Sequence, residues 1–150
     1  MTYENGNKSD GKHYWLTPPE LKKKVIDELG PEFFDPAPFP KPEDFDGLEI
    51  EWKENNYVNP PFGGFKSKIG KRMPGVTAWA RKAIAEFKKG KKVVFVYPLD
   101  KWVLMMLAAG AEIKNMGDVK WLATEDGSQG NGTGRHVAMF ILDPKKQKDG

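Results

Sequence analysis

The segment 57–64, YVNPPFGG, carries residue types that can do chemistry on a planar amine. A strand-like apolar pair leads into Asn59, two prolines follow it, and an aromatic ring, Phe62, comes next. Proline fixes its own φ, has no N–H, and pushes the residue before it toward an extended backbone. The motif therefore holds the Asn59 side chain in one direction and surrounds it with carbonyl acceptors. Its amide oxygen is a neutral acceptor for an N–H group, and the Phe62 ring can stack on a flat substrate.

A second polar loop, DPAP at residues 35–38, follows a short strand that we expect at 32–35. In an α/β fold, ligands bind beyond the carboxyl ends of the strands, so this loop and the one around Asn59 should meet in one crevice. The proline-rich loop lacks a G-x-G-x-x-G pattern, and a pyrophosphate cradle needs such glycines. We therefore expect the ligand to be a nucleoside without a phosphate chain.

The stretch 66–72, KSKIGKR, has four cations and no acid, and it directly follows the NPPF motif. Such a cluster suits a phosphate backbone, so we predict that it contacts nucleic acid. A second cluster, KKGKK at 88–92, lies at a predicted helix end, where cations also favour the helix dipole, and it fits a solvated surface equally well. The predicted nucleic-acid-binding residues are Lys66, Lys68, Lys71 and Arg72.

The composition is typical of one soluble globular domain. The chain has 150 residues, of which 39% are hydrophobic and 30% charged, with a net charge of +3. This length suits a single core, and the longest apolar run, 102–109, is too short to span a bilayer. The first 12 residues are polar and unlike a signal peptide, and the absence of cysteine leaves few metal ligands. We expect a cytoplasmic, metal-free protein that does not bind membranes.

Residues 13–143 are expected to form the domain, with disordered segments at 1–12 and 144–150. Helices are predicted at 17–30, 76–90 and 101–109, the first of them capped by Thr17 and ended by Gly30. Alternation of helices with apolar runs predicts an α/β fold with a mainly parallel sheet, an antiparallel terminal hairpin and helices on both faces. The predicted strands are 32–35, 48–52, 56–59, 92–99, 111–116, 119–123 and 136–142.

Four segments in this order, YWLTPPEL, FFDPAPF, DGLEIEW and YVNPPFGG, resemble the small phage-type DNA adenine methyltransferases. The resemblance covers roughly residues 13–142. It implies a single compact Rossmann-like methyltransferase fold. It also implies transfer of a methyl group from S-adenosylmethionine to the 6-amino group of adenine in DNA, within the host cytoplasm if a phage encodes the chain.

The resemblance also implies roles for individual residues. The family's N/D-P-P-Y/F motif is catalytic, which here means Asn59, Pro60, Pro61 and Phe62. If the Asn59 side-chain oxygen and the Pro60 carbonyl accept both amine hydrogens, the nitrogen lone pair becomes localised and points at the methyl donor. The adenine must leave its duplex to be reached, and Phe62 could then stack on it.

The D-P-x loop and the W-x-T-P element are implied to bind the cofactor, with Asp35 contacting the methionine ammonium or a ribose hydroxyl. Asp46 is a weaker second candidate, and a packed tryptophan and a helix cap are alternative explanations for the W-x-T-P element. Family members often carry Cys where this chain has Ala37 and Tyr where it has Phe62, and they lack the FKSKIGKRMPG stretch found here. The implied cofactor-binding residues are Trp15, Thr17, Asp35, Pro36, Ala37 and Asp46.

Other acceptors share this chemistry. The N-P-P-aromatic element also occurs in methyltransferases that act on RNA guanine amines or on protein glutamines, and all of these acceptors are planar amines. The glutamine enzymes carry an N-terminal helical domain, whereas few residues precede Thr17 here. A DNA-binding relative without turnover fits the basic stretch but leaves the intact motif unexplained. The sequence does not fix the DNA site, the oligomeric state or a role in restriction-modification.

Overall fold

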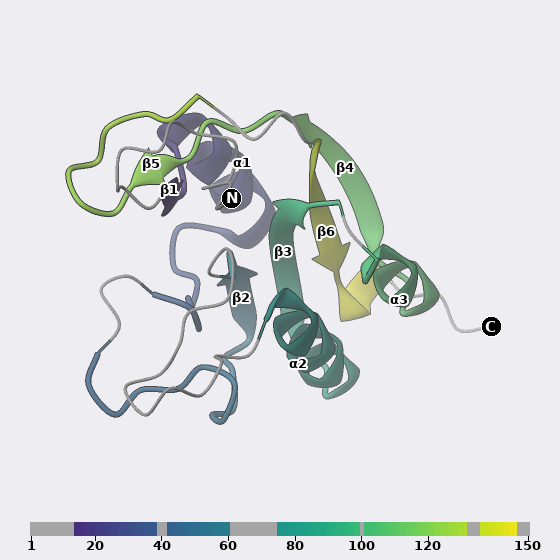
Figure 1. Cartoon of the computed structure of the whole chain (residues 1–150). Helices are drawn as coiled ribbons and strands as arrows, with labels where there is room; N and C mark the ends of the chain where they lie inside the picture. Colours follow the sequence, from purple (N-terminus) through teal and green to yellow (C-terminus); the bar gives the residue numbers. More distant parts are fainter. Residues whose placement is uncertain (1–13, 39–41, 61–74, 100, 132–135, 147–150) are drawn as a thin grey trace.

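The computed structural model describes residues 14–38, 42–60, 75–99, 101–131 and 136–146. Its main sheet has four strands in the order β2-β3-β6-β4, so β2 and β4 lie at opposite edges (Figure 1). The two central strands, β3 and β6, are buried along nearly their whole length, as their continuous apolar runs predict. The strands are β2 (Asn55–Val58), β3 (Lys92–Pro98), β4 (Glu112–Gly117) and β6 (Val137–Leu142).

The strand directions correct one prediction. β2 pairs parallel with β3, but β6 is antiparallel to both of its neighbours, β3 and β4. The sheet is therefore mixed rather than mainly parallel, and another strand, β5, lies between β4 and β6 in the chain, so these two do not form a simple hairpin. Because β2, β3 and β4 still run in one direction, their carboxyl ends share one edge of the sheet. The broader prediction of an α/β fold is confirmed.

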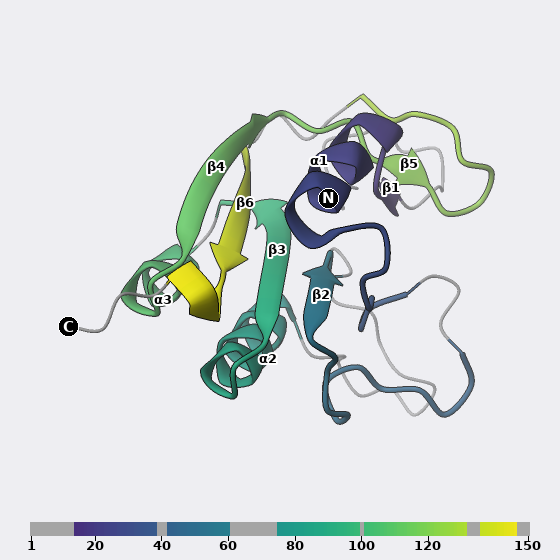
Figure 2. The ribbon, with the colours of Figure 1, turned by 180° about the vertical axis from the view of Figure 1, so that it is seen from behind.

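Helices cover both faces of this sheet. α1 and α2 both contact β3, and Figures 1 and 2 show α1 on one face and α2 with α3 on the other. At the start of α3, the Trp102 ring packs edge-on against Phe95 and Phe140, with centroids 5.1 Å away in each case. This cluster joins α3 to the two central strands. The helices are α1 (Pro19–Leu29), α2 (Val76–Lys88) and α3 (Val103–Ala108).

A second sheet of two strands is absent from the sequence predictions. β1 (Tyr14–Leu16) pairs antiparallel with β5 (Leu122–Ala123), and Figure 1 shows this pair beyond the carboxyl ends of β2 and β3. The strand predicted at 119–123 is thus shorter than expected. β1 escapes a pattern-based prediction because a strand of three residues is too short to show periodicity.

α1 begins differently from its prediction. Pro18, not Thr17, occupies the N-cap position, and no side chain caps the helix. The Thr17 hydroxyl is therefore used for tertiary contacts instead of a capping box. Gly30 ends the helix as predicted, with φ of 85° and its N–H donating to the Ile26 carbonyl at 2.7 Å.

Of the other predictions, some are confirmed only in part and some are wrong. The strand expected at 32–35 is reduced to one parallel bridge, between Phe34 and Asn56. Residues 48–52 contain turns and bends rather than a strand, and α3 is shorter than the predicted 101–109. Pro144–Lys146, expected to be disordered, form a 3-10 helix. The disorder expected at 1–12 and 147–150 lies outside the described residues.

Two lysines of the second cation cluster, Lys89 and Lys91, belong to a network around Glu86, a fully buried residue of α2. Its carboxylate lies 2.6 Å from Lys91 Nζ, 3.1 Å from Lys89 Nζ and 3.3 Å from Lys82 Nζ, and it accepts the Trp52 N–H at 2.9 Å. Burial alone would raise the pKa of Glu86, but these partners outweigh it and lower the pKa to about 2. Lys89 and Lys91 thus stabilise the fold instead of forming an open phosphate-binding surface.

Candidate functional site

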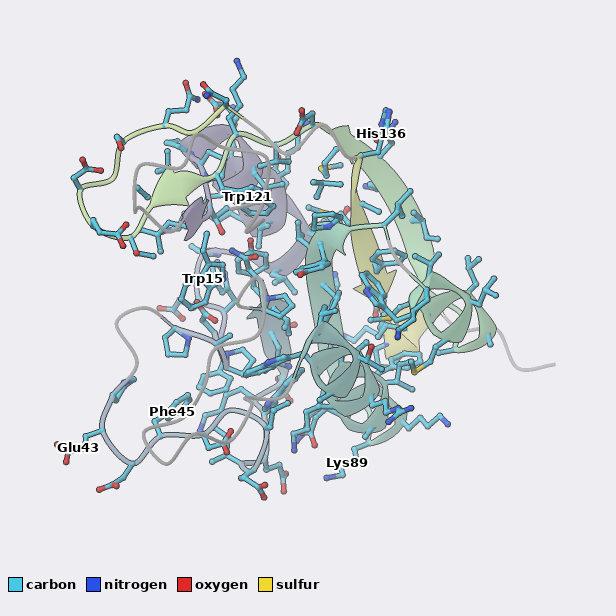
Figure 3. The ribbon with its side chains drawn as sticks, viewed as in Figure 1. Trp15, Glu43, Phe45, Lys89, Trp121 and His136 are labelled. Atoms are coloured by element: carbon cyan, nitrogen blue, oxygen red, sulfur yellow. The ribbon has the colours of Figure 1, made fainter. Side chains whose placement is uncertain are left out.

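The two polar loops converge at the carboxyl edge of the sheet, as predicted. Two backbone hydrogen bonds of 2.9 Å join Phe34 to β2 in parallel. Asp35, directly after Phe34, and Asn59, directly after β2, therefore lie at the same edge of the sheet. β1 adds a third side to the site. Figure 3 shows the Trp15 side chain between the β1–β5 pair and β2. Segments far apart in the chain therefore build one site.

Asn59 is 6% exposed, and its amide group is held by residues next to α1. Its Nδ2 donates to the Trp15 carbonyl at 2.8 Å and to Thr17 Oγ1 at 3.3 Å. Its backbone carbonyl accepts the Trp15 indole N–H at 2.9 Å. Both amide hydrogens are thus committed, and this fixes which end of the amide is the oxygen, because a flipped amide would place two oxygens together at Trp15.

The Asn59 side-chain oxygen is buried and has no hydrogen-bond partner among the described residues. A buried acceptor left unpaired costs about 1–3 kcal/mol, so such atoms are uncommon and call for an explanation. Asn56, three residues earlier on β2, shows the ordinary alternative. Its Oδ1 accepts the Lys53 N–H at 3.0 Å, and its Nδ2 donates to the carbonyls of Lys53 and Lys92. The Asn56 amide is thus fully hydrogen-bonded within the protein, whereas the Asn59 amide has an unpaired acceptor oxygen.

A hydroxyl pair supports the Asn59 amide from behind. Thr17 Oγ1 and the Tyr57 hydroxyl share a hydrogen bond of 2.7 Å. Burial raises the pKa of the Tyr57 phenol above its ordinary value, against the opposing effect of this bond, so the phenol stays protonated at neutral pH. Tyr57, Thr17 and Asn59 form a chain of hydrogen bonds that orients the amide. Sequence reasoning missed Tyr57 because an apolar-looking strand position gave no sign of its partner.

Asp35 is the acidic group of the site. Its Oδ1 accepts the Ala37 N–H at 2.9 Å, which gives the DPAP loop a local turn. Burial raises the pKa of the Asp35 carboxyl to about 6, although the Ala37 hydrogen bond and the charge of Lys22 oppose the rise. At neutral pH Asp35 is therefore mainly an anion, poorly solvated and suited to a cationic partner.

These groups line one pocket of about 240 Å³. Four predicted cofactor residues, Trp15, Thr17, Asp35 and Ala37, meet Asn59 there. Lys22 also lines this pocket. Both Lys22 and Asp35 are described residues, and the Lys22 amine forms no ion pair with the Asp35 carboxylate within 4.0 Å. The lining residues that sequence reasoning missed are Leu16, Lys22, Phe33 and Tyr57.

The DPAP loop rests on a glycine that leaves no room for a side chain. A Cβ on Gly47 would lie 1.8 Å from the Pro36 carbonyl oxygen, so the two backbones touch. The Gly47 carbonyl in turn accepts the Trp52 indole N–H at 2.7 Å. Pro36 is buried in this contact. Asp46, a predicted cofactor contact, is exposed, accepts the Leu48 N–H at 3.0 Å, and is not among the residues that line the pocket.

The NPPF motif is described only up to Pro60, which is buried. Pro61 and Phe62 lie outside the described residues, and so does the whole basic stretch. Their predicted roles in base stacking and nucleic-acid binding therefore stay predictions. The cations concerned are Lys66, Lys68, Lys71 and Arg72.

No family model, curated protein or solved structure matches this chain. Across the described ranges, no helix has both the length and the apolar character needed to cross a membrane. The same ranges hold no group of three or more His, Asp or Glu side chains that could bind a metal ion.

Proposed function

We propose that this protein is an S-adenosylmethionine-dependent methyltransferase with a Rossmann-like fold that acts on the 6-amino group of adenine in DNA. The single observation that carries the proposal is the buried, unpartnered side-chain oxygen of Asn59. An exocyclic amine can donate to this oxygen, and the site then satisfies an acceptor that the fold leaves unpaired.

The order of the segments supports the proposal. Phe34, β2 and β3 are parallel neighbours, and the DPAP and NPPF loops follow two of these segments at the carboxyl edge. Ligand sites of α/β sheets lie at this edge. The resemblance in sequence concerns the same two loops, so fold and motif agree on one place.

The residues present suit S-adenosylmethionine. The Asp35 carboxylate would hold the ammonium of its amino-acid end, and Lys22, which shares the pocket without pairing with Asp35, would hold the carboxylate. The rings of Trp15, Phe33 and Tyr57 line the same pocket. Its volume of about 240 Å³ is below the roughly 300–1,000 Å³ usual for a whole ligand, and so it fits that end of the molecule. When bound, the cofactor supplies an electrophilic methyl group on a sulfonium.

The protein's own contribution is to orient the acceptor. The hydrogen bonds from Tyr57 to Thr17 and from Thr17 to Asn59 hold the Asn59 amide so that its oxygen can accept a substrate N–H. This hydrogen bond draws the amine hydrogen out of the plane of the base. The nitrogen lone pair is then less delocalised into the ring and more available to attack the methyl group. The effect is larger in the transition state than in the ground state because the nitrogen becomes positive as it forms its new bond.

The proposal is tested by incubating the chain with methyl-labelled S-adenosylmethionine and, separately, DNA, RNA and a glutamine-containing peptide. Mass spectrometry of the digested products should find N6-methyladenine from DNA. Methylguanine from RNA, or methylglutamine from the peptide, would mean that the acceptor is a different planar amine while the proposed site stays the same. Absence of cofactor binding by calorimetry would refute the proposal.

The DNA part of the proposal has its own test. Changing the cations at 66, 68, 71 and 72 to alanine should flatten the dependence of DNA affinity on salt, because each phosphate contact releases counterions. The matched control changes Lys88, which is exposed and lies on α2 outside the site. An unchanged salt slope in the fourfold variant would remove the basic stretch from the DNA contact.

A further inference from the structure

The pairing of β1 with β5 is irregular at Trp15. Tyr14 is matched with Ala123 and Leu16 with Leu122, so two steps along β1 correspond to one step along β5. This two-against-one register is that of a β-bulge, with Trp15 as the extra residue of the longer strand. Bulges are frequent beside active sites, where they bend the strand and redirect a side chain. The position of Trp15 in β1 therefore calls for a functional explanation.

Trp15 holds Asn59 at two places. The Trp15 backbone carbonyl accepts a hydrogen from Asn59 Nδ2 at 2.8 Å, and the Trp15 indole N–H donates to the Asn59 backbone carbonyl at 2.9 Å. The two bonds close a ring between residues that are 44 positions apart in the chain. Figure 3 shows the Trp15 side chain between the β1–β5 pair and β2, which is where such a ring can form. One residue thus fixes both the backbone and the side chain of Asn59.

The direction of an asparagine amide depends on such bonds. Rotation about χ2 of asparagine has only broad preferences, so the backbone alone does not decide where the side-chain oxygen points. The second Nδ2 bond of Asn59, to Thr17 Oγ1, is longer at 3.3 Å, and Thr17 directly follows β1. Both partners of the amide therefore come from the segment that contains the bulge. The place of the unpaired Asn59 oxygen follows from where β1 puts Trp15.

We propose that Trp15 is a positioning residue, which acts through Asn59 to aim the unpaired oxygen at the substrate amine. The substrate is the one given by the proposed function, on which this inference rests. The role is separate from the cofactor contact that the sequence resemblance implies for Trp15, because it depends on the indole N–H and not on the ring face. A small rotation of the amide would move the acceptor away from the amine and slow the reaction.

The test removes the indole N–H and keeps the shape of the ring. Replacing Trp15 with benzothienylalanine puts sulfur in place of the N–H group, and Trp15→Phe removes the donor by ordinary mutagenesis. Hydrogen exchange of the Asn59 side-chain amide, followed by NMR and assigned by its absence in Asn59→Ala, should become about fivefold faster. The single-turnover rate of methyl transfer at saturating cofactor should fall about fivefold, while cofactor affinity in the benzothienylalanine variant stays within about twofold.

Trp102 is the matched control. It is 2% exposed, and its indole N–H has no hydrogen-bond partner among the described residues. The same replacement at Trp102 therefore removes a buried N–H without breaking a bond, and it should change neither the exchange of the Asn59 amide nor the transfer rate. Circular dichroism verifies that each variant is folded.

The exchange measurement needs neither cofactor nor DNA, so it separates this inference from the proposed function. Faster exchange in the Trp15 variants, in a protein without methyl transfer, would refute the proposed function but support the positioning of Asn59 by Trp15. Unchanged exchange in both folded variants would overturn the inference. It would also be overturned by a transfer rate equal to that of the wild type, or by a loss of cofactor affinity alone, since Trp15 would then serve packing or cofactor binding.

Discussion

Two buried polar centres of this molecule differ in how completely their polar groups are paired. At Glu86 both carboxylate oxygens are paired, because three lysines and a backbone N–H share them. Around Asn59 the donors are paired but one acceptor is not. Figure 3 labels a residue from each centre, Lys89 at the end of α2 and Trp15 beside β1.

The two centres also differ in the direction of their pKa shifts. The Glu86 carboxyl has a pKa lowered to about 2 by its partners, whereas burial raises the pKa of Asp35 to about 6. The first carboxylate contributes to folding, and the second opposes it. A buried polar group that costs stability is one that the fold alone does not explain, and this difference separates a structural network from a candidate site.

The largest effect should come from breaking the Glu86 network. Glu86→Gln should lower the free energy of unfolding by about 3 kcal/mol, because it leaves several cations without their shared anion. Thermal or urea denaturation measures this. The matched control is Glu51→Gln, which removes an exposed ion pair with Lys91 and should cost under about 1 kcal/mol. Equal losses in both variants would show that the buried network contributes no more to the free energy of unfolding than the exposed ion pair does.

The Glu86 network should also control acid stability. The folded pKa of about 2 is below the ordinary value of 4.5, so the stabilisation is present above pH 4.5 and is lost as the pH falls toward 2. The variant Glu86→Gln should lack this part of the acid transition.

Next in size is the loss of the unpaired acceptor. Asn59→Ala should reduce the rate of methyl transfer about a hundredfold, or ~2.7 kcal/mol, while cofactor affinity changes little. Loss of the bonds to Trp15 and Thr17 should cost about 1–3 kcal/mol of stability, so circular dichroism first verifies that the variant is folded. Single-turnover transfer to adenine-containing DNA measures the rate. Asn59→Asp keeps an oxygen acceptor but sets its second oxygen against the Trp15 carbonyl, so it should be less stable and retain only part of the activity. A variant Asn59→Ala within a few-fold of the wild type would contradict the mechanism.

Asp35→Asn should change stability and binding in opposite directions. Cofactor affinity should fall by about 1–3 kcal/mol, since an ammonium loses its anionic partner. The folded pKa of about 6 exceeds the ordinary 3.8, so ionisation destabilises the fold as the pH rises through this window, and the variant should melt higher than the wild type above pH 6. Calorimetry and thermal melts across pH test both. Wild-type affinity should also weaken below pH 6, and an unchanged affinity in the variant would remove Asp35 from the site.

The smallest effect should follow from Tyr57→Phe, which removes one hydroxyl behind the Asn59 amide. Loss of the 2.7 Å bond to Thr17 should cost about 1 kcal/mol, or roughly a fivefold slower single-turnover rate, with cofactor affinity nearly unchanged. Thr17→Ser keeps the hydroxyl and should behave like the wild type. If Tyr57→Phe changes stability but not the rate, the phenol serves packing alone.

Local pattern was sufficient for the elements that bury a regular face. α2 recurs at helical spacing, and β3 and β6 are continuous apolar runs, so their positions are predicted within about two residues. The position of Asn59 directly after a strand is also local, because the proline that follows it restricts the backbone. The sequence by itself therefore determined the α/β class and the two loops of the site.

Only the tertiary structure decided how these parts are joined. The insertion of β6 between β3 and β4, and the pairing of β1 with β5, depend on contacts between distant segments that no local period records. Thr17 has the residue type of a helix cap, yet it bonds to Tyr57, forty residues away in the chain. The unpaired oxygen of Asn59 follows from the same fact, since Trp15 and Thr17 take its amide hydrogens across more than forty residues. Residue types determine which hydrogen bonds are possible, and the packing of the whole chain decides which of them are made.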